Sequence, residues 1–284
     1  MKNIALFAAI FLLAVVLFTK DVFAGAPFVN LEGVGGVAFN PLAYLAEGES
    51  DFKVGNVDVI GKPRFGAWYV NLGDPKIDWT NFGVADTLFK RLEISYGYQT
   101  VSWLDHPTFH KNNFGAKFLV VSEDSFGSKL VPAFSIGTIY KTTSKSALRK
   151  LGFALRNTGQ DWYAVATKTI TQLPVPVIIS GGILSSQEFV TGVLGFNNNR
   201  ELTGFANIDV VLPHGFVVGW EFKQGEQFDS GYKNSNYWDA HLAWLANKNL
   251  TLIAAYTNTG SYTKTGNTRQ GLGNGFVISA QYAF

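Results

Sequence analysis

Apolar residues alternate with polar or small ones along most of this chain, with a period of two. In residues 91–101, for example, Leu92, Ile94, Tyr96 and Tyr98 alternate with charged, polar or glycine residues. Successive side chains of a β-strand point to opposite faces, so each such segment can present one apolar and one polar face. Twelve segments of this kind predict twelve strands: residues 37–46, 62–72, 91–101, 113–122, 130–141, 161–171, 176–185, 202–212, 216–224, 236–246, 250–258 and 275–284.

The last of these segments has the clearest pattern. Phe276, Ile278, Tyr282 and Phe284 share one face, and the opposite face is small or polar. The apolar face ends on the final residue of the chain, which resembles the terminal strand of bacterial outer-membrane barrels. In such proteins the barrel assembly machinery reads this strand as a signal, so we interpret these four residues as lipid-facing and assembly-directing.

Deletion of Phe284 is therefore expected to impair membrane assembly more than any chemistry of the protein. The measurement is the fraction of protein that inserts into the outer membrane, with and without the residue. Normal insertion of the truncated chain would contradict the assembly role.

The lengths of the connections support a transmembrane barrel. Outer-membrane barrels alternate short periplasmic turns with longer external loops and have an even strand number in bacterial single chains. Counted back from Phe284, residues 259–274 are long and 247–249 are short, and the alternation continues with one exception. Residues 73–90 form a long connection on the periplasmic side, which we interpret as a short helix or a turn that caps the barrel. The prediction is an all-β, antiparallel up-and-down barrel of twelve strands, with ten or fourteen strands, or a soluble β-sandwich, as alternatives.

The N-terminus has the pattern of a secretory signal peptide. Lys2 precedes an apolar run at residues 4–18, and small residues follow, so cleavage after Ala24 or Ala26 is expected. A membrane anchor is the alternative, but the run is shorter than the roughly 20 apolar residues that span a bilayer. The expected organisation is a signal peptide at residues 1–24 and an outer-membrane barrel at residues 25–284.

Composition narrows the function classes. Without residues 1–24 the chain has 21 basic and 20 acidic residues, and such a neutral balance argues against nucleic-acid binding. The absence of cysteine excludes disulfides, thiolate metal sites and thiol catalysis. Thirty glycines, 15% aromatic residues and only 15% charged residues suit an outer-membrane barrel better than a soluble periplasmic enzyme. Expected partners are outer-membrane lipid and lipopolysaccharide, the assembly machinery and small solutes, and no cofactor is expected.

Charged residues on the polar strand faces are expected to point inward, because charges exposed to lipid are costly. Two interpretations stay open: the charges line an aqueous path and set its selectivity, or they pair across strands and fill the interior. The predicted lumen residues are Arg91, Glu93, Lys117, Lys168, Asp209, Glu221, Lys223, Asp239 and His241.

Three further patterns are candidate sites. Asp239 and His241 share a strand face and could form part of a general-base arrangement, but no G-x-S-x-G motif supplies a nucleophile. We therefore expect an ion pair and no enzyme activity. His106 and His110 flank Pro107 beside Asp105, which favours a solvated loop over a metal site.

The segment at residues 142–160 contains four basic residues and no acidic side chain before Gln160. Leu148, Leu151 and Leu155 are spaced to share a helical face. External cations here could contact lipopolysaccharide phosphates, and a solvated helical loop on the barrel rim is the alternative.

Several stretches of the chain also resemble one family. The opening LEGVGGVAFNPLAY (residues 31–44), IGKPRFG (60–66), ATKTI (166–170) with LPVP (173–176), and YWDAH (237–241) with NKNL (247–250) are similar to an uncharacterised family of Gram-negative outer-membrane proteins, known only as a domain of unknown function. The resemblance implies a barrel and gives neither a substrate nor catalytic residues. The favoured function is a small pore or transport channel with a mixed-charge lumen. A structural or interaction barrel with a filled lumen is the alternative, and an outer-membrane hydrolase is third.

Overall fold

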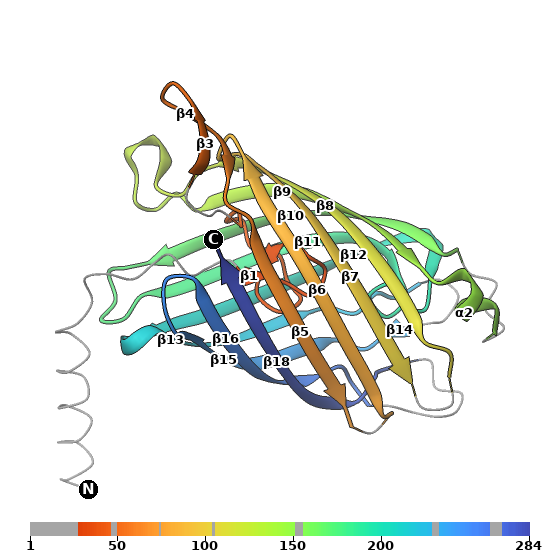
Figure 1. Ribbon diagram of the computed structural model, residues 1–284. Helices are drawn as coiled ribbons and strands as arrows, with labels where there is room; N and C mark the ends of the chain where they lie inside the picture. The colour runs from red at the N-terminus through yellow and green to blue at the C-terminus, as the bar shows by residue number, and fades with distance from the viewer. Residues whose placement is uncertain are drawn as a thin grey trace, which may run out of the picture.

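The computed structural model describes residues 28–46, 50–73, 75–103, 106–150, 156–228, 233–261 and 269–284. Within these residues the chain forms a closed antiparallel barrel of twelve strands (Figure 1), which confirms the predicted fold class and strand number. The predicted signal peptide lies outside the described residues, and so do Asp105, Leu151 and Leu155.

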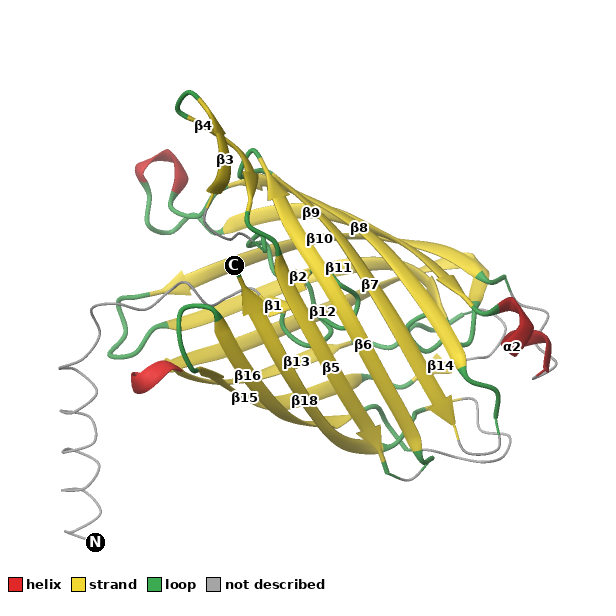
Figure 2. Ribbon diagram, in the orientation of Figure 1, coloured by secondary structure: helices red, strands yellow, loops and turns green. Residues whose placement is uncertain are grey.

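Each barrel strand pairs with the barrel strands before and after it in the sequence, and the last strand pairs with the first (Figure 2). The strands are β5 (Arg64–Leu72), β6 (Ile77–Leu88), β7 (Leu92–Trp103), β8 (Phe109–Val121), β9 (Ala133–Thr143), β10 (Thr158–Ile170), β11 (Val177–Glu188), β12 (Phe196–Leu212), β13 (Phe216–Lys223), β15 (Tyr237–Leu245), β16 (Leu250–Asn258) and β18 (Asn274–Ala283). Closure through β18 and β5 leaves no barrel edge with unpaired backbone groups.

Smaller elements decorate the barrel. A hairpin of β3 (Ser50–Val54) and β4 (Val57–Gly61) meets β6 through the single pair Ile60–Leu88. The others are β1 (Phe28–Val29), β2 (Gly35–Gly36), β14 (Lys233–Asn234), β17 (Arg269–Gln270), the 3₁₀ turns η1 (Ser125–Gly127) and η2 (Pro213–Gly215), and the helix α2 (Lys145–Lys150). No helix in the described part of the chain is both long and apolar enough to cross a membrane.

The two faces of the barrel follow the alternation in the sequence. The outer face carries large exposed apolar side chains, such as Phe118, Ile136 and Trp162. The inner face carries buried polar and charged ones, such as Lys117, Ser135 and Asp161 on the same strands. Apolar outside and polar inside is the arrangement of a barrel that lies in lipid.

The predictions for two segments are wrong, but the errors cancel in the strand number, because one predicted strand is absent and one strand was not predicted. Residues 37–46 form no barrel strand; they lie inside the barrel. Residues 73–90 are not a cap, because most of them form β6, which pairs with β7 along its whole length and with β5 over residues 77–85. β5 is therefore the first strand of the barrel. It begins at the end of the barrel where β18 finishes.

Candidate functional site

Residues 28–46, hereafter the luminal segment, run inside the ring of strands, where they are drawn in red and orange (Figure 1). Nearly all of them are buried. The Asn30 side chain shapes the first turn by accepting hydrogen bonds from the backbone N–H groups of Glu32 and Val34, at 2.9 and 3.1 Å. Gly33 has φ +92°, and a Cβ there would lie 2.6 Å from the Tyr96 carbonyl carbon of the wall. The segment is therefore fitted closely against the barrel.

Glu221 on β13 holds the middle of the luminal segment. Its carboxylate accepts hydrogen bonds from three consecutive backbone N–H groups, those of Ala38 (2.7 Å), Phe39 (3.2 Å) and Asn40 (3.0 Å). The Asn40 side chain in turn donates to the carbonyl oxygens of Ala206 and Phe222 in the wall. Successive N–H groups that converge on one carboxylate form an anion-binding nest, here occupied by the barrel's own side chain.

A buried ion pair holds the segment at two further points. Glu93 accepts hydrogen bonds from the N–H groups of Gly35 and Ala46, at 2.7 and 2.6 Å. Lys117, whose Nζ lies 2.9 Å from Glu93, donates to the carbonyl oxygens of Gly35, Leu42 and Tyr44. Two charges that neighbour each other on β7 and β8 thus bond backbone groups of the luminal segment from the barrel wall.

Smaller polar side chains fix the two ends. Near the start, Gln281 accepts a hydrogen bond from the Val29 N–H at 3.0 Å, and the Trp68 indole donates to the Val29 carbonyl. Near the end, the Ala43 N–H donates to Thr167 Oγ1 at 2.8 Å, and Ser135 donates to the Ala43 carbonyl. Apolar contacts complete the packing, because Val34 and Ala43 share a buried cluster with inward-facing aromatic residues of the wall.

A second group of charges fills the barrel toward the end opposite Phe284. Lys141 Nζ lies 2.5 Å from carboxylate oxygens of Glu32, Asp161 and Glu188. Lys111 pairs with Glu32 at 3.1 Å, and Lys223 pairs with Glu188 at 2.5 Å and Glu226 at 3.6 Å. Burial alone would raise the pKa of the Glu32 carboxyl, but Lys141 and Lys111 hold this pKa below its usual value. We call these residues the buried ion network: Glu32, Lys111, Lys141, Asp161, Glu188, Lys223 and Glu226.

A third group surrounds His241. The imidazole Nδ1 lies 2.8 Å from Asp239 and Nε2 lies 2.8 Å from Asp209, across the position of Gly219. Side-chain atoms of Glu221, Asp239 and His241 lie within 4.8 Å of one another, which a metal ion would also require. Both imidazole nitrogens face carboxylate oxygens, however, so both are placed to carry a hydrogen and neither offers a lone pair to a metal. The geometry is that of a buried ion-pair group.

Of the nine predicted lumen residues, seven lie inside the barrel: Glu93, Lys117, Asp209, Glu221, Lys223, Asp239 and His241. Six of them contact the luminal segment or one another, and Lys223 pairs with Glu188 and Glu226 of the buried ion network. The prediction for Lys168 is wrong, because Thr167 faces the lumen and Lys168 therefore points outward, where it pairs with Glu123 and Asp124 beside η1. The prediction for Arg91 is also wrong: it lies exposed in the turn before β7 and donates to the Leu119 carbonyl.

The two histidines of the other candidate site contact different residues. His110 approaches the Tyr98 hydroxyl with Nδ1 at 2.8 Å, whereas the His106 ring packs against Trp103. In the basic segment, α2 buries Ala147 and Leu148 and exposes Lys145, Arg149 and Lys150. Phe276, Ile278, Tyr282 and Phe284 all lie exposed on the outer face, and their assembly role stays a prediction.

Sequence reasoning missed most of the buried ion network. Lys111 and Glu188 lie just beyond the predicted ends of their strands, residues 113–122 and 176–185. Both lie on the inward-facing side of the strand that they extend. Lys111, for example, precedes the inward-facing Lys117 by six residues, an even number. Longer strands would have revealed them.

The comparisons with known proteins agree with this architecture. The model of the family described as "Protein of unknown function (DUF3034)" matches residues 26–279, so the chain belongs to that family, as its resemblance implied. None of the curated proteins matches it in sequence. Among solved structures, the KdgM porin is similar with a TM-score of 0.52 and 13% identity, over 78% of this chain and 99% of that one. The NanC porin is similar with a TM-score of 0.50 and 10% identity, over 78% of this chain and 98% of that one. These likenesses show the fold alone.

Proposed function

We propose that this DUF3034 protein is an outer-membrane channel whose lumen is closed by the luminal segment and conducts when that segment is displaced. The observation that carries the proposal is the capture of three consecutive backbone N–H groups of the segment by Glu221. Two structures with the same fold are described as porins, which supports a channel-type barrel. The apolar outer face and the polar interior support a place in the outer membrane, with lipid and lipopolysaccharide around the barrel.

Displacement of the segment would leave the barrel intact. The wall closes through the pairing of β18 with β5, and no residue of the luminal segment takes part in that ladder. The contacts that hold the segment include side-chain hydrogen bonds to its backbone, from Glu93, Lys117 and Glu221. Water or a charged solute can replace such bonds one at a time. The luminal segment can therefore act as a plug, because it fills the lumen without being part of the wall. Small solutes are the proposed substrates of the channel.

A filled, structural barrel is the second candidate. The observation that favours it is the buried ion network, in which Lys141 and Glu188 are fully buried and each has more than one partner of opposite charge. Such a network occupies the interior next to the luminal segment and would itself restrict passage. In that case the external loops would contact the partner of the protein.

A crosslink between plug and wall tests the channel proposal. The chain has no cysteine, so Ala43→Cys with Thr167→Cys introduces the only thiols, at positions joined by a 2.8 Å hydrogen bond. In planar bilayers we expect brief openings of the reduced double variant and almost none after oxidation, with recovery when the disulfide is reduced. The two single variants, treated identically, are the controls.

Two outcomes would count against this function. Conductance that is the same before and after the crosslink would show that ions do not pass where the segment lies. A protein that never conducts, even after residues 28–46 are deleted, would support the filled barrel.

A further inference from the structure

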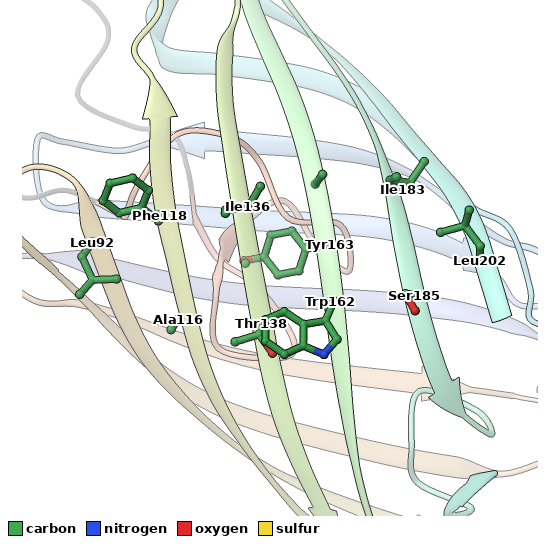
Figure 3. Close-up of a pocket in the computed structure, with 12 residues that line it drawn as sticks. Leu92, Ala116, Phe118, Ile136, Thr138, Trp162, Tyr163, Ile183, Ser185 and Leu202 are labelled. Carbon is green, nitrogen blue, oxygen red and sulfur yellow. The ribbon is translucent and has the colours of Figure 1, made fainter. Parts of the chain in front are cut away.

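The outer face of the barrel has an apolar hollow of about 480 Å³ across strands β7 to β12 (Figure 3). It arises because small side chains alternate with large ones in two neighbouring rows of the sheet. Ala116 and Thr138 pair with each other in one row, and Ala164 pairs with Ile136 in the next. Phe118, Ile136 and Trp162 rise around them and are about half exposed. This volume lies within the range of about 300–1,000 Å³ that small-molecule sites occupy.

A cation lies at one end of the hollow. Arg200 is two residues before Leu202, which lines the hollow, and its Nη1 donates to the carbonyl of Ser185, another lining residue, at 3.3 Å. A second bond from Nη1 to the Gln160 carbonyl, at 2.7 Å, lays the guanidinium across three strands. No ion pair among the described residues includes Arg200, and its Nε and Nη2 carry further donors.

The position of Arg200 indicates which leaflet it meets. β12 runs toward the end of the barrel at which β18 finishes, so Arg200, near the start of β12, lies toward the opposite end. The exposed cations of α2 lie at this end as well. If both chain ends are periplasmic, as the loop lengths predict, the cation faces the outer leaflet.

From this arrangement we infer a lipid site: one acyl chain of a lipopolysaccharide molecule lies in the hollow, and one of its phosphates binds Arg200. The hollow offers an apolar lining to a hydrocarbon chain, and the guanidinium offers paired donors that suit phosphate oxygens. The inference rests on the proposed membrane orientation and is independent of whether the lumen conducts.

The test measures lipopolysaccharide bound to the purified, folded barrel by native mass spectrometry in detergent. Arg200→Gln removes the charge and leaves a shorter, polar side chain, and Ala164→Phe fills the hollow from its floor. Each is expected to weaken binding about tenfold, Arg200→Gln because the phosphate loses its charged donors and Ala164→Phe because the aromatic ring occupies the volume of the acyl chain. Lys248→Gln, an exposed cation in the turn between β15 and β16, is the matched control and should bind as the wild type does.

Three results would overturn the inference. Equal binding by all four proteins would show that lipid adheres without this site. Equal binding of lipopolysaccharide stripped of its phosphates would remove the role of Arg200. Equal or tighter binding of phosphatidylglycerol would assign the site to a phospholipid instead. Heat-dependent gel mobility verifies that each variant is folded, and bilayer conductance of the same samples separates this question from the channel function.

Discussion

Replacement of Glu221 by alanine is expected to raise the channel activity of the protein by about a hundredfold in open probability. The carboxylate bonds three consecutive N–H groups of the luminal segment, and the variant leaves all three donors, two of them buried, without this acceptor. Loss of bonds to a charged group costs roughly 1.5–3 kcal/mol each, and only the closed state suffers the loss. A net shift of about 2.8 kcal/mol corresponds to the hundredfold change in the ratio of open to closed molecules.

Single-channel recording in planar bilayers measures this effect directly. Glu221→Gln keeps one neutral oxygen acceptor and should give an intermediate increase. Asp124→Asn is the matched control, because Asp124 pairs with the outward-facing Lys168 and no described hydrogen bond joins it to the luminal segment. If a folded Glu221→Ala protein opened no more often than the control, the nest would not be what closes the lumen.

The sequence predicts the strands whose outer faces contact lipid. Lipid outside forces an apolar face on every strand, so β7, β13 and β18 are visible as alternation. The alternation does not reveal β6, because its outer face includes Asp78, Thr80 and Asp86. Its inner face carries the buried Ile77 and Trp79. The polarity of the strand is thus reversed near its start, and the usual pattern disappears.

The plug could not be predicted for a related reason. Residues 37–46 are apolar enough to resemble a strand, and nothing in a single sequence shows that they pack inside the barrel. Their backbone is satisfied by side chains more than 100 residues away, such as Glu221 and Thr167, in place of a neighbouring strand. The alternation along a strand predicts that a charged side chain points inward. Its partner depends on which distant residues the closed barrel brings next to it. The alternation therefore predicts the correct face for Glu93 and Lys117, but it does not predict the segment that they hold.

Lys141 gives the clearest test of what the buried ion network contributes to stability. Replacement by methionine preserves the approximate volume but leaves Glu32, Asp161 and Glu188 without the ammonium group they share. Removal of one partner from a buried group of charges typically costs about 3–5 kcal/mol, because the remaining charge stays buried without compensation. We expect a loss of this size in the free energy of unfolding, measured by denaturant titration of the barrel in lipid vesicles.

Lys168→Met is the matched comparison, since Lys168 also bonds two carboxylates but does so at the rim of the barrel beside solvent. Ion pairs at such positions contribute about 0–1 kcal/mol, so its loss should be small. Among the described ion pairs Asp161 has Lys141 as its one partner, so Asp161→Asn added to Lys141→Met removes one stranded charge and should restore part of the stability. Equal losses from the Lys141 and Lys168 variants, with no recovery in the double variant, would mean that the network is not coupled. Glu32 is the residue of the luminal segment that belongs to the buried ion network. In that case its ion pairs would not help to hold the segment, and the bonds from Glu93, Lys117 and Glu221 would do so.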